Sequence, residues 1–88
     1  MIWSVYIILC SDGSYYTGIS TDVERRFRQH QQGRGAKYFR SRQPSRIVFV
    51  ETGYCRASAT RRELALKKMK HAEKAHLIVA HQEYGDSD

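Results

Sequence analysis

Three short segments rich in β-branched and aromatic residues predict β-strands. They span residues 2–10, 14–20 and 46–52. The first is almost entirely apolar, which is typical of a buried strand. Ser11, Asp12 and Gly13 separate the first two segments and predict a tight turn. We therefore expect these two strands to pair antiparallel.

The length of this turn decides which side chains share a face of the sheet. A two-residue loop would put Tyr6 and Tyr16 on opposite faces. A three-residue loop, with Gly13 in the left-handed conformation, pairs Tyr6 with Gly18 and puts both tyrosines on one face. We expect the three-residue loop, with Gly18 allowing a backbone segment or a ligand to approach the strand closely.

Residues at helical spacing predict three helices, over residues 22–32, 58–69 and 71–81. Thr21 and Glu24 have the spacing of a capping box at the start of the first helix. Gly33 and Gly35 follow its end. Residues 36–42 predict a short basic helix, which Pro44 ends.

The first helix has a narrow apolar stripe formed by Val23 and Phe27. Arg26 and His30, four residues apart, lie on the margin of this stripe. We therefore expect both side chains to point along the edge of the sheet rather than into open solvent.

The second helix is expected to pack through an apolar arc with Glu63 on its rim. Arg62 falls inside this arc, so its guanidinium requires a route to water or an acidic partner. The candidate partners are Glu24, Glu51 and Glu73. The arc comprises Ala59, Ala65, Leu66 and Met69, and the third helix is expected to pack through Ala72, Ala75, Leu77, Ile78 and Val79.

The predicted order of elements is β-β-α-β-α-α. This order predicts an α+β fold, a three-stranded antiparallel sheet flanked by helices. The chain has 88 residues, which is enough for one domain over residues 1–83, with residues 84–88 as a frayed polar tail. A domain of this size leaves little room for a deep cavity, so we expect any site to be a shallow surface groove.

The chain is basic, and its charge is unevenly distributed. Lys and Arg number 15 against 9 Asp and Glu, for a net charge of +6. Residues 1–24 contain no Lys or Arg, whereas residues 25–46 contain no acidic residue. A basic block beside a neutral one favours nucleic acid as the partner over a membrane. The residues expected to contact the nucleic-acid backbone are Arg25, Arg34, Lys37, Arg40 and Arg42.

Other classes of protein are disfavoured. No apolar run is long enough for a membrane span, and the first residues do not resemble a signal peptide. Cys10 and Cys55 lack metal-binding spacing and are expected to be reduced and mostly buried, as in a cytoplasmic protein. The histidines between residues 71 and 81 are five apart, on different sides of a helix, and do not predict a zinc site.

The predicted fold brings together the parts that a phosphodiester hydrolase needs. These are a base for water, a cation for the phosphate and a carboxylate for a divalent metal. Two tyrosines share a sheet face, Arg26 and His30 lie at a helix edge, and Glu63 lies on a later helix.

The motifs that carry these residues resemble those of the GIY-YIG endonuclease superfamily. Residues 5–7 (VYI) and 16–18 (YTG) resemble its paired tripeptides, and Arg62-Glu63 resembles its metal-binding helix. Arg26 and His30 follow the second tripeptide at family-like spacing. Residues 33–38 (GRGAKY) resemble a segment of the small stand-alone single-domain bacterial branch, the YhbQ and YazA type. The resemblance covers residues 5–78.

The resemblance implies Mg²⁺- or Mn²⁺-dependent cleavage of a nucleic-acid backbone, with one divalent ion bound by Glu63. It implies that Tyr6 is the general base and that Tyr16 hydrogen-bonds the water or the phosphate, although the two could exchange roles. Arg26 would clamp the scissile phosphate. His30 would orient the phosphate or assist proton transfer.

The sequence thus predicts a divalent-metal-dependent endonuclease, acting on DNA in repair or recombination. The alternatives are a non-catalytic nucleic-acid-binding module, or an adaptor of a repair complex, that retains the fold. The sequence leaves the oligomeric state open, with a monomer favoured.

Overall fold

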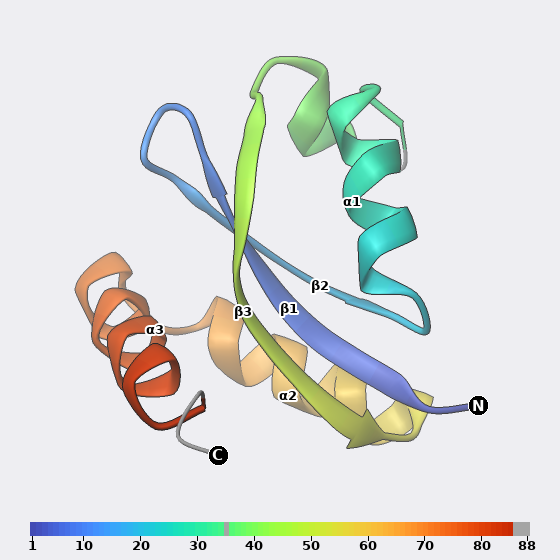
Figure 1. Cartoon of the computed structure of the whole chain (residues 1–88), viewed down its shortest axis with the longest axis vertical. Helices are drawn as coiled ribbons and strands as arrows, with labels where there is room; N and C mark the ends of the chain where they lie inside the picture. The colour runs from blue at the N-terminus through green and yellow to red at the C-terminus, as the bar shows by residue number, and fades with distance from the viewer. Residues whose placement is uncertain (35, 86–88) are drawn as a thin grey trace.

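A computed structural model describes residues 1–34 and 36–85 of the chain. It contains three strands, β1 (Trp3–Cys10), β2 (Tyr15–Ser20) and β3 (Pro44–Tyr54). The α-helices are α1 (Val23–Gln31), α2 (Arg56–Lys67) and α3 (His71–Gly85), and a single 3₁₀ turn, η1 (Lys37–Arg40), precedes β3. The order of elements and the α+β class are as predicted (Figure 1).

The strands form one antiparallel sheet in the order β2-β1-β3. Tyr6 pairs with Gly18, as the three-residue turn requires. Gly13 has a φ of +85°, the left-handed conformation that this turn needs, and its N–H donates to the Cys10 carbonyl at 2.9 Å. The predicted register between β1 and β2 is therefore confirmed.

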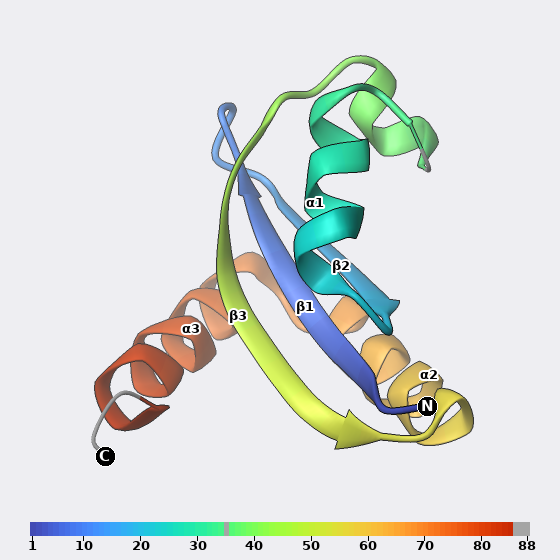
Figure 2. The ribbon, with the colours of Figure 1, turned by 45° about the vertical axis from the view of Figure 1, so that its right-hand side comes forward.

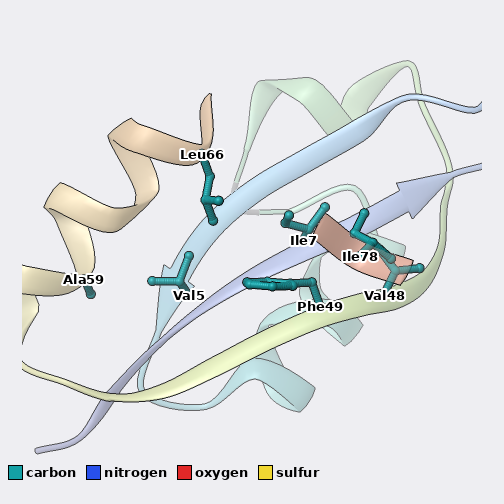
Figure 3. Packing of buried hydrophobic residues seen from close by; sticks show 7 residues of the cluster. All are labelled: Val5, Ile7, Val48, Phe49, Ala59, Leu66 and Ile78. Carbon is teal, nitrogen blue, oxygen red and sulfur yellow. The ribbon is translucent and has the colours of Figure 1, made fainter. Parts of the chain in front are cut away.

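The sheet is covered on both faces, which gives the small domain two hydrophobic clusters (Figure 2). Helices α2 and α3 cover one face, and Figure 3 shows this cluster, whose members are Val5, Ile7, Val48, Phe49, Ala59, Leu66 and Ile78. Helix α1 and η1 cover the other face, where Tyr6, Ile8, Cys10 and Phe39 are buried. Each fully buried aliphatic or aromatic side chain contributes about 1.5–3 kcal/mol of transfer free energy.

Strand β3 is longer than the predicted 46–52 because irregularities let it continue. Ile7 pairs with Phe49 and Ile8 with Ile47, so Val48 is an extra residue, and Val48 and Phe49 both join the α2–α3 cluster. At a second irregularity, Trp3 pairs with Tyr54 and Ser4 pairs with Thr52, so Gly53 is an extra residue, and its φ is +98°. The strand begins at Pro44, a position that proline tolerates because it donates no ladder hydrogen bond.

The expected starts of two helices are wrong. The N-cap of α1 is Asp22 rather than Thr21, and its Oδ1 accepts from the Arg25 N–H at 3.1 Å. A carboxylate is a strong acceptor next to the positive end of the helix dipole. Helix α2 begins at Arg56 rather than residue 58, because Cys55 is its N-cap. The Cys55 thiol accepts from the Ser58 N–H, and the Ser58 hydroxyl accepts from the Cys55 N–H.

Other expectations about packing also need correction. Cys55 is exposed rather than buried, although both cysteines are free. Ala65, Ala72 and Val79 are exposed, so they do not contribute to the core as expected. Helix α3 extends to Gly85, beyond the predicted start of the tail, and residues 86–88 lie outside the described part of the chain.

Arg62 has the acidic partner that its position requires. Its Nε and Nη2 donate to the two carboxylate oxygens of Glu51, at 2.8 and 3.2 Å. Glu51, one of the three candidates, lies on β3 and also accepts from the Tyr54 hydroxyl at 3.0 Å. This bidentate pair ties α2 to the sheet next to Glu63.

No helix among residues 1–34 and 36–85 is long and apolar enough to cross a membrane.

Candidate functional site

The candidate site lies at the β2 edge of the sheet, where Gly18, which has no side chain, leaves space for two tyrosine rings. Tyr6 comes from the central strand β1, and its ring lies over Gly18 of β2. A Cβ at position 18 would be 2.5 Å from Tyr6 Oη, 2.7 Å from Tyr6 Cζ and 3.1 Å from Tyr16 Cε2. The backbone of Gly18 is thus in contact with both tyrosines, and any larger residue would displace them.

His30 of α1 holds the Tyr6 hydroxyl. Tyr6 Oη is 3.0 Å from His30 Nε2, and His30 Nδ1 is 3.2 Å from the Arg34 carbonyl oxygen. A carbonyl only accepts, so Nδ1 carries the proton and Nε2 accepts from the Tyr6 hydroxyl. Burial lowers the pKa of His30, which therefore stays neutral at pH 7, although the Arg34 carbonyl opposes this shift.

His30 is completely buried, which agrees with the expectation that it does not point into open solvent, but it lies inside the core-facing stripe of α1 rather than on its margin. Its ring packs against Phe39 and Tyr16, with centroid distances of 4.4 and 5.2 Å. The physical reason is helical spacing, because His30 lies seven residues after Val23 and three after Phe27. The core-facing stripe of α1 therefore includes His30. A search for apolar residues alone does not count this side chain, because histidine is ionisable.

The two tyrosines are neutral phenols in this arrangement. Their ring centroids are 6.3 Å apart. Burial raises the pKa of Tyr6, with Tyr16 adding to the shift, and burial also raises the pKa of Tyr16. The Arg26 guanidinium lowers the pKa of both phenols, but by less than burial raises it.

Arg26 and Glu63 reach the tyrosines from opposite layers. Arg26 of α1 is half-buried, and its Nη1 donates to Gln29 Oε1 at 3.0 Å. Glu63 of α2 is near enough for its charge to raise the pKa of both Tyr6 and Tyr16. Its side chain is 17% exposed and lies 3.4 Å from Lys67 Nζ. The structure thus places Tyr6, Tyr16 and His30 in direct contact, with Arg26 and Glu63 near enough for their charges to act on both phenols.

A divalent ion fits this set through Glu63 alone. Among residues 1–34 and 36–85, no group of three or more His, Cys, Asp or Glu side chains could hold a metal ion. Mg²⁺ keeps several waters and is often held by one or two carboxylates together with substrate phosphates. Glu63 meets that requirement, because it is a carboxylate oxygen donor whose side chain is partly open to solvent.

All five predicted backbone-binding residues are exposed, but one of them also has partners within the protein. Arg25, Arg34, Lys37 and Arg40 are exposed. The Arg42 guanidinium, in contrast, lies 4.3 Å from the Tyr38 ring centroid and bonds Asp12 at 3.0 Å. Arg42 is therefore engaged within the protein and is a weaker candidate for phosphate contact than the other four.

An open groove of about 330 Å³ begins at Arg26. It agrees with the expected shallow site. It is lined by Trp3, Ile19, Ser20, Thr21, Asp22, Arg25, Arg26 and Gln29.

Sequence analysis missed several residues of this region. Trp3 and Gln29 were not expected at the site, and neither was the Arg34 carbonyl that orients His30. Tyr38 packs on Tyr16 with a centroid distance of 5.3 Å. Only Tyr38 had a sequence signal, because it ends the segment 33–38 that resembles the small branch of the family.

Comparison with known proteins agrees with this geometry. The family model of the GIY-YIG catalytic domain matches residues 2–76, so the chain belongs to the GIY-YIG family. It is 50% identical to a UPF0213 protein of Cupriavidus pinatubonensis over 82% of this chain and 80% of that protein. It is 47% identical to a UPF0213 protein of Halobacterium salinarum, over 84% and 96% of the two chains.

Two solved structures share the fold. The solution NMR structure of the UPF0213 protein BH0048 from Bacillus halodurans has a TM-score of 0.58 and 41% identity, over 91% of this chain and 85% of that one. The solution NMR structure of EF2693 from E. faecalis has a TM-score of 0.62 and 34% identity, over 93% and 88%. The predicted resemblance to the small stand-alone members of the family is thereby confirmed.

Proposed function

We propose that the protein is a divalent-metal-dependent endonuclease that hydrolyses phosphodiester bonds in DNA. The observation that carries this proposal is the convergence at the β2 edge of a hydrogen-bonded Tyr6–His30 pair, Arg26 and Glu63. A GIY-YIG domain implies membership of a nuclease family. The preference for DNA, the role in repair or recombination and a cytoplasmic location rest on the sequence and its family resemblance.

The Tyr6–His30 pair favours Tyr6 over Tyr16 as the base. A phenol with a raised pKa is a poor base unless its own proton has an acceptor. Neutral His30 is that acceptor, because Nε2 already takes the hydrogen bond from Tyr6. As Tyr6 Oη removes a proton from the attacking water, the phenol proton passes to His30 Nε2. The water oxygen bonds to phosphorus while the bond from phosphorus to the ester oxygen breaks, and the departing oxygen takes a proton from solvent.

Arg26 stabilises the charge that develops on the phosphate. Its guanidinium bonds Gln29 in the free protein, and we expect it to exchange this amide oxygen for phosphate oxygens. Tyr6 is only 1% exposed, so this movement of Arg26 is also expected to let the water reach the phenol. When bound, a divalent ion on Glu63 supplies further positive charge to the phosphate.

The proposal is tested with labelled single-stranded, duplex and branched DNA in the presence of Mg²⁺ or Mn²⁺. We expect metal-dependent cleavage that Glu63→Ala and Arg26→Ala each abolish. The matched controls are Glu73→Ala and Arg28→Ala, which remove the same charges from exposed positions on helices. Cleavage that survives both site substitutions would refute the assignment of the site.

The binding-module alternative predicts a different outcome. It predicts no cleavage of any substrate, together with binding whose affinity falls steeply with salt.

A further inference from the structure

The groove beside Arg26 has a composition that a phosphate-binding cleft alone does not need. We propose that it binds the nucleobase next to the scissile phosphate, and that Trp3 is the stacking surface for this base. The identity of the substrate in this inference rests on the proposed nuclease function. The fold places the groove where the start of β1 lies beside the turn from β2 into α1 (Figure 2).

The groove has the size and chemical mixture of a small-ligand site. Its volume of about 330 Å³ is at the lower end of the range for such sites. Its apolar surface comes from Trp3 and Ile19, and hydroxyl or amide groups come from Ser20, Thr21 and Gln29. A planar heterocycle with polar edges requires this combination of apolar surface and hydrogen-bonding groups.

Trp3 provides the aromatic surface. It is the only tryptophan in the chain, and its side chain is partly buried against the α2–α3 cluster but still lines the groove. The Arg56 guanidinium lies 5.6 Å from its ring centroid. Aromatic side chains are the usual stacking surfaces for bases of single-stranded nucleic acid, and arginines add cation–π contacts.

The charges in the groove favour a base over a second phosphate beside Asp22. Arg25 and Arg26 supply positive charge along α1. Asp22, however, also lines the groove, and its carboxylate would repel a phosphate there. A base avoids this repulsion because it carries no net charge.

Arg26 connects the groove to the reacting phosphate. It lines the groove and also influences the pKa of Tyr6 and Tyr16. A phosphate bound by Arg26 therefore has its neighbouring nucleotide at the mouth of the groove. Because the groove can admit only a base that has left its helical stack, this nucleotide must be unpaired or flipped out.

The first test leaves the protein unchanged. Binding is measured in EDTA, without cleavage, from the fluorescence of Trp3. The ligand is an oligothymidylate of about eight nucleotides, and its control is an abasic oligomer of the same length and charge. We expect the thymidylate to quench the fluorescence and the abasic oligomer to bind about 5- to 100-fold more weakly with little quenching. Equal binding and equal quenching would overturn the proposal.

The second test changes the ring. Binding of the labelled thymidylate to Trp3→Leu and Trp3→Phe is followed by anisotropy, and folding of both variants is checked by circular dichroism. We expect Trp3→Phe, which keeps an aromatic face, to bind much more tightly than Trp3→Leu. A folded Trp3→Leu protein that binds like the parent would overturn the proposal.

These tests separate the inference from the function on which it rests. Base-dependent quenching without metal-dependent cleavage would support the groove assignment and refute the nuclease. Cleavage without base dependence in either binding test would support the nuclease and refute the groove assignment.

Discussion

Replacing Gly18 by alanine is the most direct test of how the site is built. The new Cβ would stand 2.5 Å from Tyr6 Oη and 2.7 Å from Tyr6 Cζ. Both atoms belong to one rigid ring, which is 1% exposed and bonded to His30. The Tyr6 ring therefore has to swing away from β2, and the 3.0 Å bond to His30 is the contact that this movement strains.

The expected cost follows from this overlap. Forcing an extra methyl group into a packed core costs about 1–3 kcal/mol. For a domain of this size, each kcal/mol lowers the melting temperature by about 4–8 °C. Gly18→Ala should therefore melt at least several degrees below the parent, and DNA cleavage should fall more than stability alone explains.

The assay is thermal unfolding by circular dichroism, together with cleavage measured well below the melting temperature. The control is Thr52→Ala, at an exposed position of β3. Tyr6→Phe in the Gly18→Ala background removes the closest contact, so it should recover part of the lost stability. A Gly18→Ala protein that melts and cleaves like the parent would refute the close packing inferred here.

Three further predictions concern the buried polar contacts. Tyr6→Phe should keep the fold but reduce cleavage about 100- to 10,000-fold, as measured by single-turnover kinetics, because the phenol proton relay is lost. Glu51→Gln should cost about 1–3 kcal/mol in urea unfolding, because it breaks the bidentate contact with Arg62; an unchanged midpoint would count against it. Burial lowers the pKa of His30 in the folded state, so the unfolded chain binds more protons below about pH 6.5. Stability should therefore fall as the pH drops below about 6.5, and replacing His30 by Gln should flatten this dependence in urea unfolding; an equally steep dependence in the variant would contradict it.

Much of the fold was predictable because local signals agreed with the tertiary structure. The turn at Gly13 determined the pairing of Tyr6 with Gly18. A shift of one residue would move every buried side chain of the strand to the opposite face of the sheet. Arg62 was correctly expected to need a partner. The choice of Glu51 among three glutamates depended on the path of β3, which no local pattern specifies.

The members of the candidate site were predicted from the sequence, but their detailed contacts were not. Family spacing identified Tyr6, Arg26 and Glu63, and the structure places them at one edge. The burial of His30 was missed because hydropathy patterns treat histidine as polar. Contacts with backbone atoms, such as that from His30 to the Arg34 carbonyl, cannot be predicted from residue types, because every residue has the same backbone carbonyl. The groove at Trp3 depends on segments distant in sequence.

The position of the site between two layers has a consequence for how the chain acquires activity. Arg26 and His30 belong to the layer on one face of the sheet, whereas Glu63 belongs to the layer on the other. A nascent or partly melted chain that has formed only one layer lacks either Glu63 or both Arg26 and His30, so its candidate site is incomplete. Under the proposed nuclease function, an incompletely folded copy would therefore not cleave nucleic acid, because detachment of either layer removes part of the candidate site.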